Sequence, residues 1–125
     1  MLQDSPVTPY IPVSNLARAR KFYEDVVGFK PSEEVNGGIV YRCGGGTEIF
    51  MYASGGAGTS KASQAFWQVK DIKAEMAQLR SRGLTFEHYD FPGMTMEDDI
   101  ATGGGAMAAW FRDSEGNIMA IIQAI

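Results

Sequence analysis

The sequence predicts an α+β fold in which one strand–helix–strands pattern occurs twice. Residues 13–16 (VSNL) correspond to residues 69–72 (VKDI), and in each half a glycine followed by a large apolar residue closes the helix. Because each half contains only one helix, both helices should lie on one face of a mainly antiparallel sheet. Two curved half-sheets of this kind would form a cleft between them, with the helices on the outer face.

The first half begins with a strand expected over residues 8–13, where two prolines favour an edge position or irregular pairing. Ser14 and Asn15 are both suitable N-caps for a helix over residues 16–27. Apolar residues recur there at three- and four-residue steps, which is typical of an amphipathic helix. Gly28 follows, where a left-handed C-terminal cap is expected.

Two more strands are expected over residues 38–43 and 47–53, separated by three glycines. The composition then changes to Gly, Ala and Ser, which is typical of a flexible linker. We therefore expect a single domain spanning residues 1–125. It should consist of a first module over about 6–54, a linker over about 55–63 and a second module over about 64–125.

The second half repeats the order with a strand over residues 65–69 and a helix that Asp71 can cap and Gly83 can close. A strand is expected over residues 84–89, and the chain should end with two strands over 107–112 and 117–123.

Residues 90–105 form a polar and glycine-rich stretch with several large apolar side chains. Purely solvated loops rarely carry so many. We expect this stretch to close over the cleft or to extend a dimer contact, and a mobile solvated loop is the alternative. Its large apolar residues are Phe91, Met94, Met96 and Ile100.

The composition limits the classes of partner. The net charge is −4, the pI is about 4.9, and lysine and arginine do not cluster. This excludes nucleic acid as a partner and disfavours an anionic membrane surface. No apolar run approaches the roughly 20 residues that span a bilayer, and no secretory signal is visible. Seven methionines and a single cysteine, which cannot form an intrachain disulfide, favour a reducing, cytoplasmic location.

Three segments, in order, resemble the vicinal oxygen chelate superfamily, which includes glyoxalase I, extradiol dioxygenases and the fosfomycin- and bleomycin-resistance proteins. They are PVSNL at 12–16 with KFYEDVVGF at 21–29, the stretch 69–84, and AWFRDSEGNI at 109–118. The resemblance covers nearly the whole chain. It implies paired βαβββ modules and, commonly, a homodimer whose two-fold contact involves the sheets.

Enzymes of that superfamily hold a divalent ion with four side chains, two from each module. The resemblance places these positions at Thr8, Glu48, Gln64 and Ala120. Glu48 matches, and Gln is a ligand in some glyoxalases, but Ala120 offers no donor. One carboxylate and one amide are a weak ligand set for a hard cation, and open catalytic metal sites usually keep three protein ligands. We therefore expect no metal and no cofactor.

In the register of the family, three strands direct alternate side chains into the cleft. The expected ligand-binding residues are Tyr10, Glu48, Phe50, Tyr52, Gln64 and Phe66. Their aromatic rings would stack on flat rings of a ligand. Glu48 would recognise a cation or a hydrogen-bond donor, or would act as a general base. The alternatives are that the aromatic residues fill a collapsed core and that Glu48 pairs with Arg42 or Gln64.

These features favour a metal-free protein of the bleomycin-resistance type, which sequesters a small organic molecule that is hydrophobic and cationic or aromatic. An enzyme of the same superfamily is the first alternative. It would be a lyase, isomerase or dioxygenase with Glu48 as metal ligand or general base. A regulatory module whose cleft is filled by its own side chains is the second. Whether the chain is an enzyme stays open, although the incomplete metal site favours binding alone.

Overall fold

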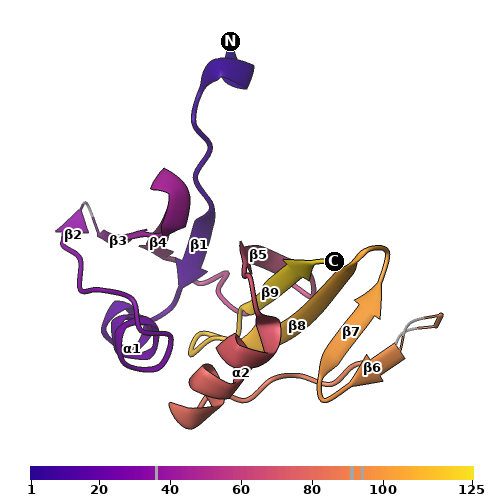
Figure 1. Cartoon of the computed structure of the whole chain (residues 1–125). Helices are drawn as coiled ribbons and strands as arrows, with labels where there is room; N and C mark the ends of the chain where they lie inside the picture. Colours follow the sequence, from indigo (N-terminus) through magenta and orange to yellow (C-terminus); the bar gives the residue numbers. More distant parts are fainter. Residues whose placement is uncertain (36, 91, 94) are drawn as a thin grey trace.

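The computed structural model describes residues 1–35, 37–90, 92–93 and 95–125, and its strands form two separate sheets (Figure 1). The first sheet has the order β1-β4-β3-β2 and the second has the order β5-β9-β8-β7-β6. The β1–β4 and β5–β9 pairs are parallel, and the other paired strands are antiparallel. The predicted α+β architecture with mainly antiparallel half-sheets is therefore confirmed. The strands are β1 (Tyr10–Val13), β2 (Glu34–Val35), β3 (Gly38–Arg42), β4 (Glu48–Ala53), β5 (Ser63–Gln68), β6 (Thr95–Glu97), β7 (Ile100–Gly103), β8 (Ala106–Arg112) and β9 (Ile118–Ala124).

Each module carries one helix that begins at the predicted cap. The Asn15 side chain accepts a hydrogen bond from the Arg18 N–H at 3.0 Å, and the Asp71 side chain accepts one from the Ala74 N–H at 3.1 Å. These bonds satisfy backbone donors that a helix start otherwise leaves free. The helical segments are α1 (Leu16–Lys21), which continues as the π-helix η2 (Phe22–Val26), then α2 (Ile72–Ser81) and the short 3-10 turns η1 (Leu2–Asp4) and η3 (Gly44–Gly46).

The helix-covered faces of both sheets meet in one buried cluster. Along β4, Ile49 and Met51 point into this cluster, whereas Phe50 and Tyr52 alternate to the opposite face. Each sheet therefore has a core face and a second face that none of the helices in the described ranges covers, which we call the helix-free face. The largest buried side chains come from both modules and include Tyr23, Tyr41, Met51, Met76, Phe111 and Met119.

The strand predicted over residues 84–89 is wrong, because only an isolated bridge between Phe86 and Phe111 forms there. β7 occupies the edge of β8 from residue 106 to residue 108. The segment after α2 can therefore reach only the far end of β8, where the Glu87 N–H donates to the Trp110 carbonyl at 2.8 Å.

The stretch 90–105 contains the hairpin β6–β7 rather than a loop. Asp98 and Asp99 form its turn with φ of 52° and 63°, the left-handed conformation that tight hairpins use and that Asp tolerates. The stretch thus extends the second sheet by two strands. Phe91 and Met94 lie outside the described residues, so the predicted lid or interface role stays a prediction.

Candidate functional site

Three of the predicted ligand-binding residues lie together on the helix-free face of the first sheet. The Tyr10 ring stacks on the Tyr52 ring, with centroids 3.8 Å apart and planes at 17°, and its centroid lies 5.5 Å from that of Phe50. The parallel register of β1 and β4 pairs Tyr10 with Phe50 and Pro12 with Tyr52, which places all of them on one face. Tyr10 is 62% exposed. These rings form an accessible aromatic surface and are not part of the buried cluster.

Glu48 lies at the edge of this aromatic surface, at the exposed start of β4. It faces Arg42 in the β3–β4 register, but within the described residues no ion pair joins the two. A cavity of about 820 Å³ lies on one side, lined by Glu48, Arg42, Val35, Val40 and residues 31–33. The carboxylate therefore faces solvent and is available to a ligand.

The second module meets Glu48 at a smaller cavity of about 180 Å³, which Phe66 also lines. Phe66 is 54% exposed and lies on the helix-free face of the second sheet. Gln64 is directed elsewhere, because its Nε2 donates to Asn117 Oδ1 at 3.2 Å. Glu48 and Phe66 are thus brought together, whereas Gln64 is engaged in a contact that supports the fold.

The four positions that correspond to metal ligands do not form a donor set for a divalent ion. Thr8 lies exposed before β1, and Ala120 is buried between its register partners Phe66 and Trp110. Only Glu48 supplies a charge, and hard cations take several oxygen ligands with charge among them. In the described part of the chain, no three His, Cys, Asp or Glu side chains gather in a way that could hold a metal.

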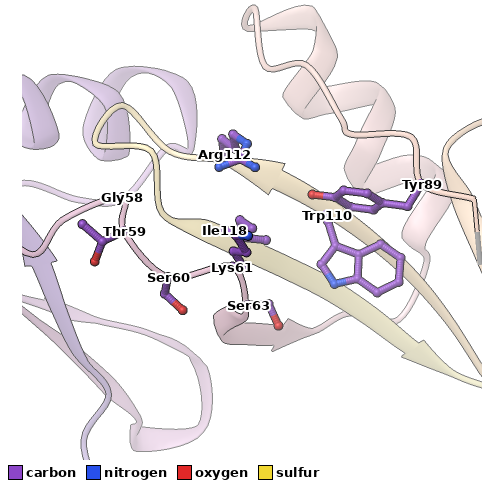
Figure 2. Close-up of a pocket in the computed structure, with 9 residues that line it drawn as sticks. All are labelled: Gly58, Thr59, Ser60, Lys61, Ser63, Tyr89, Trp110, Arg112 and Ile118. Carbon is purple, nitrogen blue, oxygen red and sulfur yellow. The ribbon is translucent and has the colours of Figure 1, made fainter.

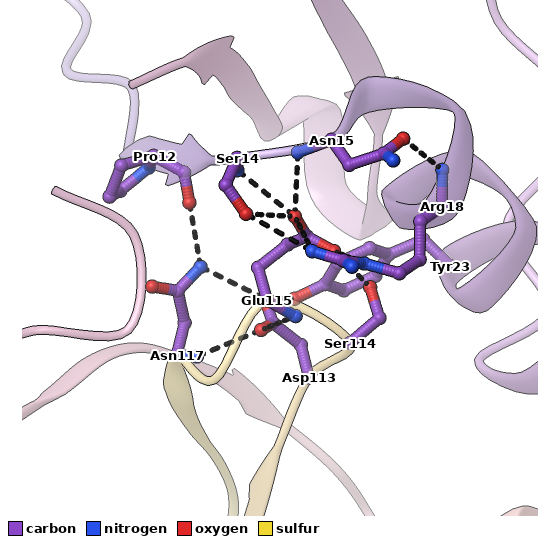
Figure 3. A network of polar contacts seen from close by, with 9 residues as sticks. All are labelled: Pro12, Ser14, Asn15, Arg18, Tyr23, Asp113, Ser114, Glu115 and Asn117. Atoms are coloured by element: carbon purple, nitrogen blue, oxygen red, sulfur yellow. Dashed lines mark hydrogen bonds and ion pairs between the residues drawn. The ribbon is translucent and has the colours of Figure 1, made fainter. Parts of the chain in front are cut away.

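A polar network joins the β8–β9 turn to the start of α1 (Figure 3). The Glu115 side chain is buried, and its carboxylate accepts hydrogen bonds from Ser14 N at 2.9 Å, Asn15 N at 2.8 Å and Arg18 Nε at 2.8 Å. Burial of this carboxylate would raise its pKa, but hydrogen bonds from Arg18, Ser114, Asn15 and Ser14 outweigh that effect and lower the pKa to about 2. The carboxylate is therefore ionised and holds the two modules together.

Asn117 and Asp113 extend this network into the core. The Asn117 Nδ2 donates to the Pro12 carbonyl at 2.8 Å and to Asp113 Oδ2 at 3.0 Å, while its Oδ1 accepts the Gly58 N–H at 3.0 Å. The Tyr23 hydroxyl donates to Asp113 Oδ2 at 2.6 Å. Burial, together with the neighbouring Asp113 carboxylate, raises the Tyr23 pKa well above its usual value. These contacts position the linker and are structural.

A further cavity of about 630 Å³ lies on the helix-free face of the second sheet, and none of the predicted site residues lines it (Figure 2). We call it the linker pocket. Alternation along β8 could have identified part of it, since Trp110 and Arg112 flank the core residue Phe111. No pattern in the sequence could have predicted that the linker lies against these strands. The linker pocket is lined by Gly58, Thr59, Ser60, Lys61, Ser63, Tyr89, Trp110, Arg112 and Ile118.

Comparison with known proteins gives one family and several similar folds. The family model described as Glyoxalase/Bleomycin resistance protein/Dioxygenase superfamily matches residues 5–121. No curated protein sequence matches the chain. Within the described ranges, no helix has the length and apolar character needed to cross a membrane.

Three solved structures illustrate the similarity. A bleomycin-binding protein in complex with bleomycin is 19% identical, with 97% of this chain and 99% of that chain covered and a TM-score of 0.72. A glyoxalase family protein from Bacillus anthracis is 16% identical, with 96% of each chain covered and a TM-score of 0.70. TnmS3, an antibiotic binding protein from Streptomyces sp. CB03234, is 20% identical, with 98% of each chain covered and a TM-score of 0.69. At these identities the similarity establishes the fold.

Proposed function

Because the chain belongs to the Glyoxalase/Bleomycin resistance protein/Dioxygenase superfamily, we propose that it binds and sequesters a small hydrophobic compound, cationic or aromatic, without a metal ion. The observation that carries this proposal is the stack of Tyr10 on Tyr52, which lies exposed on the same sheet face as the Glu48 carboxylate. Flat ligand rings stack favourably on such a surface, and a carboxylate beside it recognises a cation or a donor.

The surroundings of Glu48 suit the binding of an organic molecule, and Glu33 is the described carboxylate that an acid–base alternative would use beside it. An acid–base reaction needs a second group in hydrogen-bond reach of the same substrate. The described residues that line the two cavities at Glu48 include the apolar residues Val35, Val40 and Phe66. The polar groups there include Arg42, the Glu33 carboxylate and the Cys43 thiol, and among the described residues no hydrogen bond or ion pair joins any of these three to Glu48. Carboxylates beside apolar walls suit recognition of an organic molecule that carries a cation or a hydrogen-bond donor.

We further propose that two copies of the chain form a homodimer in the cytoplasm, each copy being one domain with the module limits given above. Support comes from the large apolar side chains on the helix-free faces, where Phe66 is 54% and Val35 is 42% exposed in addition to Tyr10. Large exposed apolar side chains of this kind are enriched at interfaces and ligand sites when they gather into a patch. Sedimentation velocity should therefore give the mass of a dimer, and a monomer at micromolar concentration would contradict this part.

Thermal shift with the planar aromatic cations berberine and ethidium tests the binding proposal. We expect a concentration-dependent rise in the melting temperature, because a ligand that binds only the folded state stabilises it by mass action. The rise should shrink in Glu48→Gln and Tyr52→Ala. Glu97→Gln, which removes an exposed carboxylate from β6, should leave it unchanged. A uniformly flat response to both compounds would contradict the proposal and favour a filled, regulatory module.

The alternative is an enzyme, a lyase, isomerase or dioxygenase, in which Glu48 acts as metal ligand or general base. The observation that supports this alternative is that the Glu48 carboxylate is accessible. Metal analysis of protein purified without chelator separates the two. A stoichiometric divalent ion that is lost in Glu48→Ala would favour the enzyme, whereas ligand binding by metal-free protein supports sequestration.

A further inference from the structure

We infer that the linker pocket is a binding site for an aromatic or planar organic anion, such as an aryl carboxylate. This inference goes beyond the proposed function, because the pocket lies on the second sheet and shares no residue with the aromatic surface of the first. Its volume of about 630 Å³ is within the range of small-molecule sites.

The charge of the pocket points to an anion. The protein has a net charge of −4, yet Lys61 and Arg112 line this cavity, and none of the described residues that line it is an acid. Lys61 forms no ion pair with any described residue. Its ammonium can therefore pair with a ligand carboxylate without giving up a partner, which makes it the first candidate for recognition of the charge.

Arg112 presents a guanidinium whose direction is fixed. Its Nε donates to Glu87 Oε1 at 2.7 Å and its Nη1 donates to the Gly116 carbonyl at 3.3 Å. A guanidinium has five N–H donors. The two contacts orient the group and leave its other donors available to a ligand. Glu87 offsets part of the Arg112 charge, so that among the described lining residues Lys61 is the cation without an ion-pair partner.

The aromatic part of the ligand has a matching wall. The Tyr89 and Trp110 rings meet edge to face with centroids 5.8 Å apart. Figure 2 shows both rings on one side of the pocket and the linker with its hydroxyl groups on the other, with Arg112 and Lys61 between them. A flat ring bound against the indole would thus place an attached carboxylate near the two cations.

The linker side of the pocket is held in place by contacts with the β8–β9 turn. The Gly58 N–H donates to Asn117 Oδ1 at 3.0 Å, and a Cβ at Gly58 would lie 2.6 Å from the Glu115 carbonyl oxygen. The backbone just before Lys61 is therefore fixed against the β8–β9 turn.

Calorimetric titration with 2-naphthoate and its neutral isostere 2-naphthamide tests the inference. We expect saturable binding of naphthoate, at least fivefold tighter than that of naphthamide at low ionic strength. Lys61→Gln should weaken naphthoate binding at least fivefold and leave naphthamide unchanged. Lys73→Gln, which removes an exposed lysine from α2, should change neither affinity.

Three results would overturn the inference: no saturable binding of naphthoate, equal affinities for the two compounds, or equal effects of Lys61→Gln and Lys73→Gln. Loss of naphthoate binding in Tyr52→Ala but not in Trp110→Leu would place the ligand on the first sheet and would also reject the linker pocket. The thermal-shift screen with cations tests the Glu48 site independently of this titration. Failure of one proposal therefore does not contradict the other.

Discussion

Glu115, on the turn between β8 and β9, accepts the Nε–H of Arg18 from α1 at 2.8 Å, so that an ion pair links the second module to the first. The same carboxylate accepts the backbone N–H groups of Ser14 and Asn15 at the start of the first helix. Segments about one hundred residues apart, 12–16 and 109–118, are therefore in direct contact. Their joint presence in the sequence has a structural cause, because each completes the hydrogen bonding of the other.

Acid should weaken the fold through Glu115. Its pKa in the folded protein is about 2, compared with an ordinary value of 4.5. A lowered carboxyl pKa stabilises the fold above the unfolded pKa, and that stabilisation is lost as pH falls towards the folded pKa. We expect the free energy of unfolding to decrease by on the order of 2 kcal/mol between about pH 4.5 and pH 2 because of this group. Urea denaturation at a series of pH values, followed by tryptophan fluorescence, measures the decrease.

Glu115→Gln identifies the group responsible. The variant should be less stable at pH 7, because a neutral amide accepts the converging N–H groups more weakly, and its stability should depend less on acid. Glu97→Gln is the matched control, since its carboxylate is exposed on β6. Parallel acid profiles for wild type and Glu115→Gln would rule out this assignment.

Asn117→Asp should destabilise the protein more than its nearly unchanged shape suggests. The Asn117 Nδ2 donates to the Pro12 carbonyl and to Asp113 Oδ2, and a carboxylate oxygen there would face two acceptors. Creating a buried repulsion of this kind costs on the order of 3 kcal/mol. Asn15→Asp is the comparison, because an N-cap uses only the acceptor oxygen and should tolerate the change. Chemical denaturation at pH 7 compares the two, and similar stabilities would show that the Asn117 donors are unimportant.

The fold could be predicted because its signals are local and periodic. The capping residues Asn15 and Asp71 and the repeat around residues 13–16 and 69–72 set the position of both helices. Strand alternation was also informative: it placed Tyr10, Phe50 and Tyr52 on one face. The hairpin at Asp98 and Asp99 was missed, because two aspartates with positive φ carry a weaker turn signal than Asn-Gly.

The sites were harder to predict because they depend on contacts between distant segments. Gln64 looked like a cleft residue from alternation alone, yet it hydrogen-bonds Asn117, which lies 53 residues away. The linker pocket needs the linker to fold back on β8 and β9, and that depends on Gly58 meeting the β8–β9 turn. Local patterns contain no information about such docking.

Alkali should weaken the fold through its buried tyrosines. Burial raises the pKa of the Tyr41 hydroxyl, and the Glu24 carboxylate, which accepts a hydrogen bond from this hydroxyl at 2.7 Å, raises it further. The protonated form is thus favoured in the folded state, so stability is complete below the unfolded pKa of about 10 and declines as pH rises above it. Absorbance titration of native and urea-unfolded protein should show delayed ionisation in the native state. In Tyr41→Phe, the absorbance change at high pH should be smaller by the contribution of one tyrosine. An unchanged amplitude would refute the assignment.

Gly58→Ala should destabilise the protein and disturb the linker pocket. Gly58 has a φ of +74°, which is unfavourable for alanine, and the added Cβ would lie 2.6 Å from the Glu115 carbonyl oxygen. Since the backbone must shift, the hydrogen bond from Gly58 N–H to Asn117 should weaken, and we expect a loss on the order of 2 kcal/mol. Gly55→Ala is the matched control, because it lies in the same linker with no atom within 4 Å of the added Cβ. Denaturation curves of the two variants should differ clearly. Equal stabilities would mean that the linker is not held against the β8–β9 turn in solution.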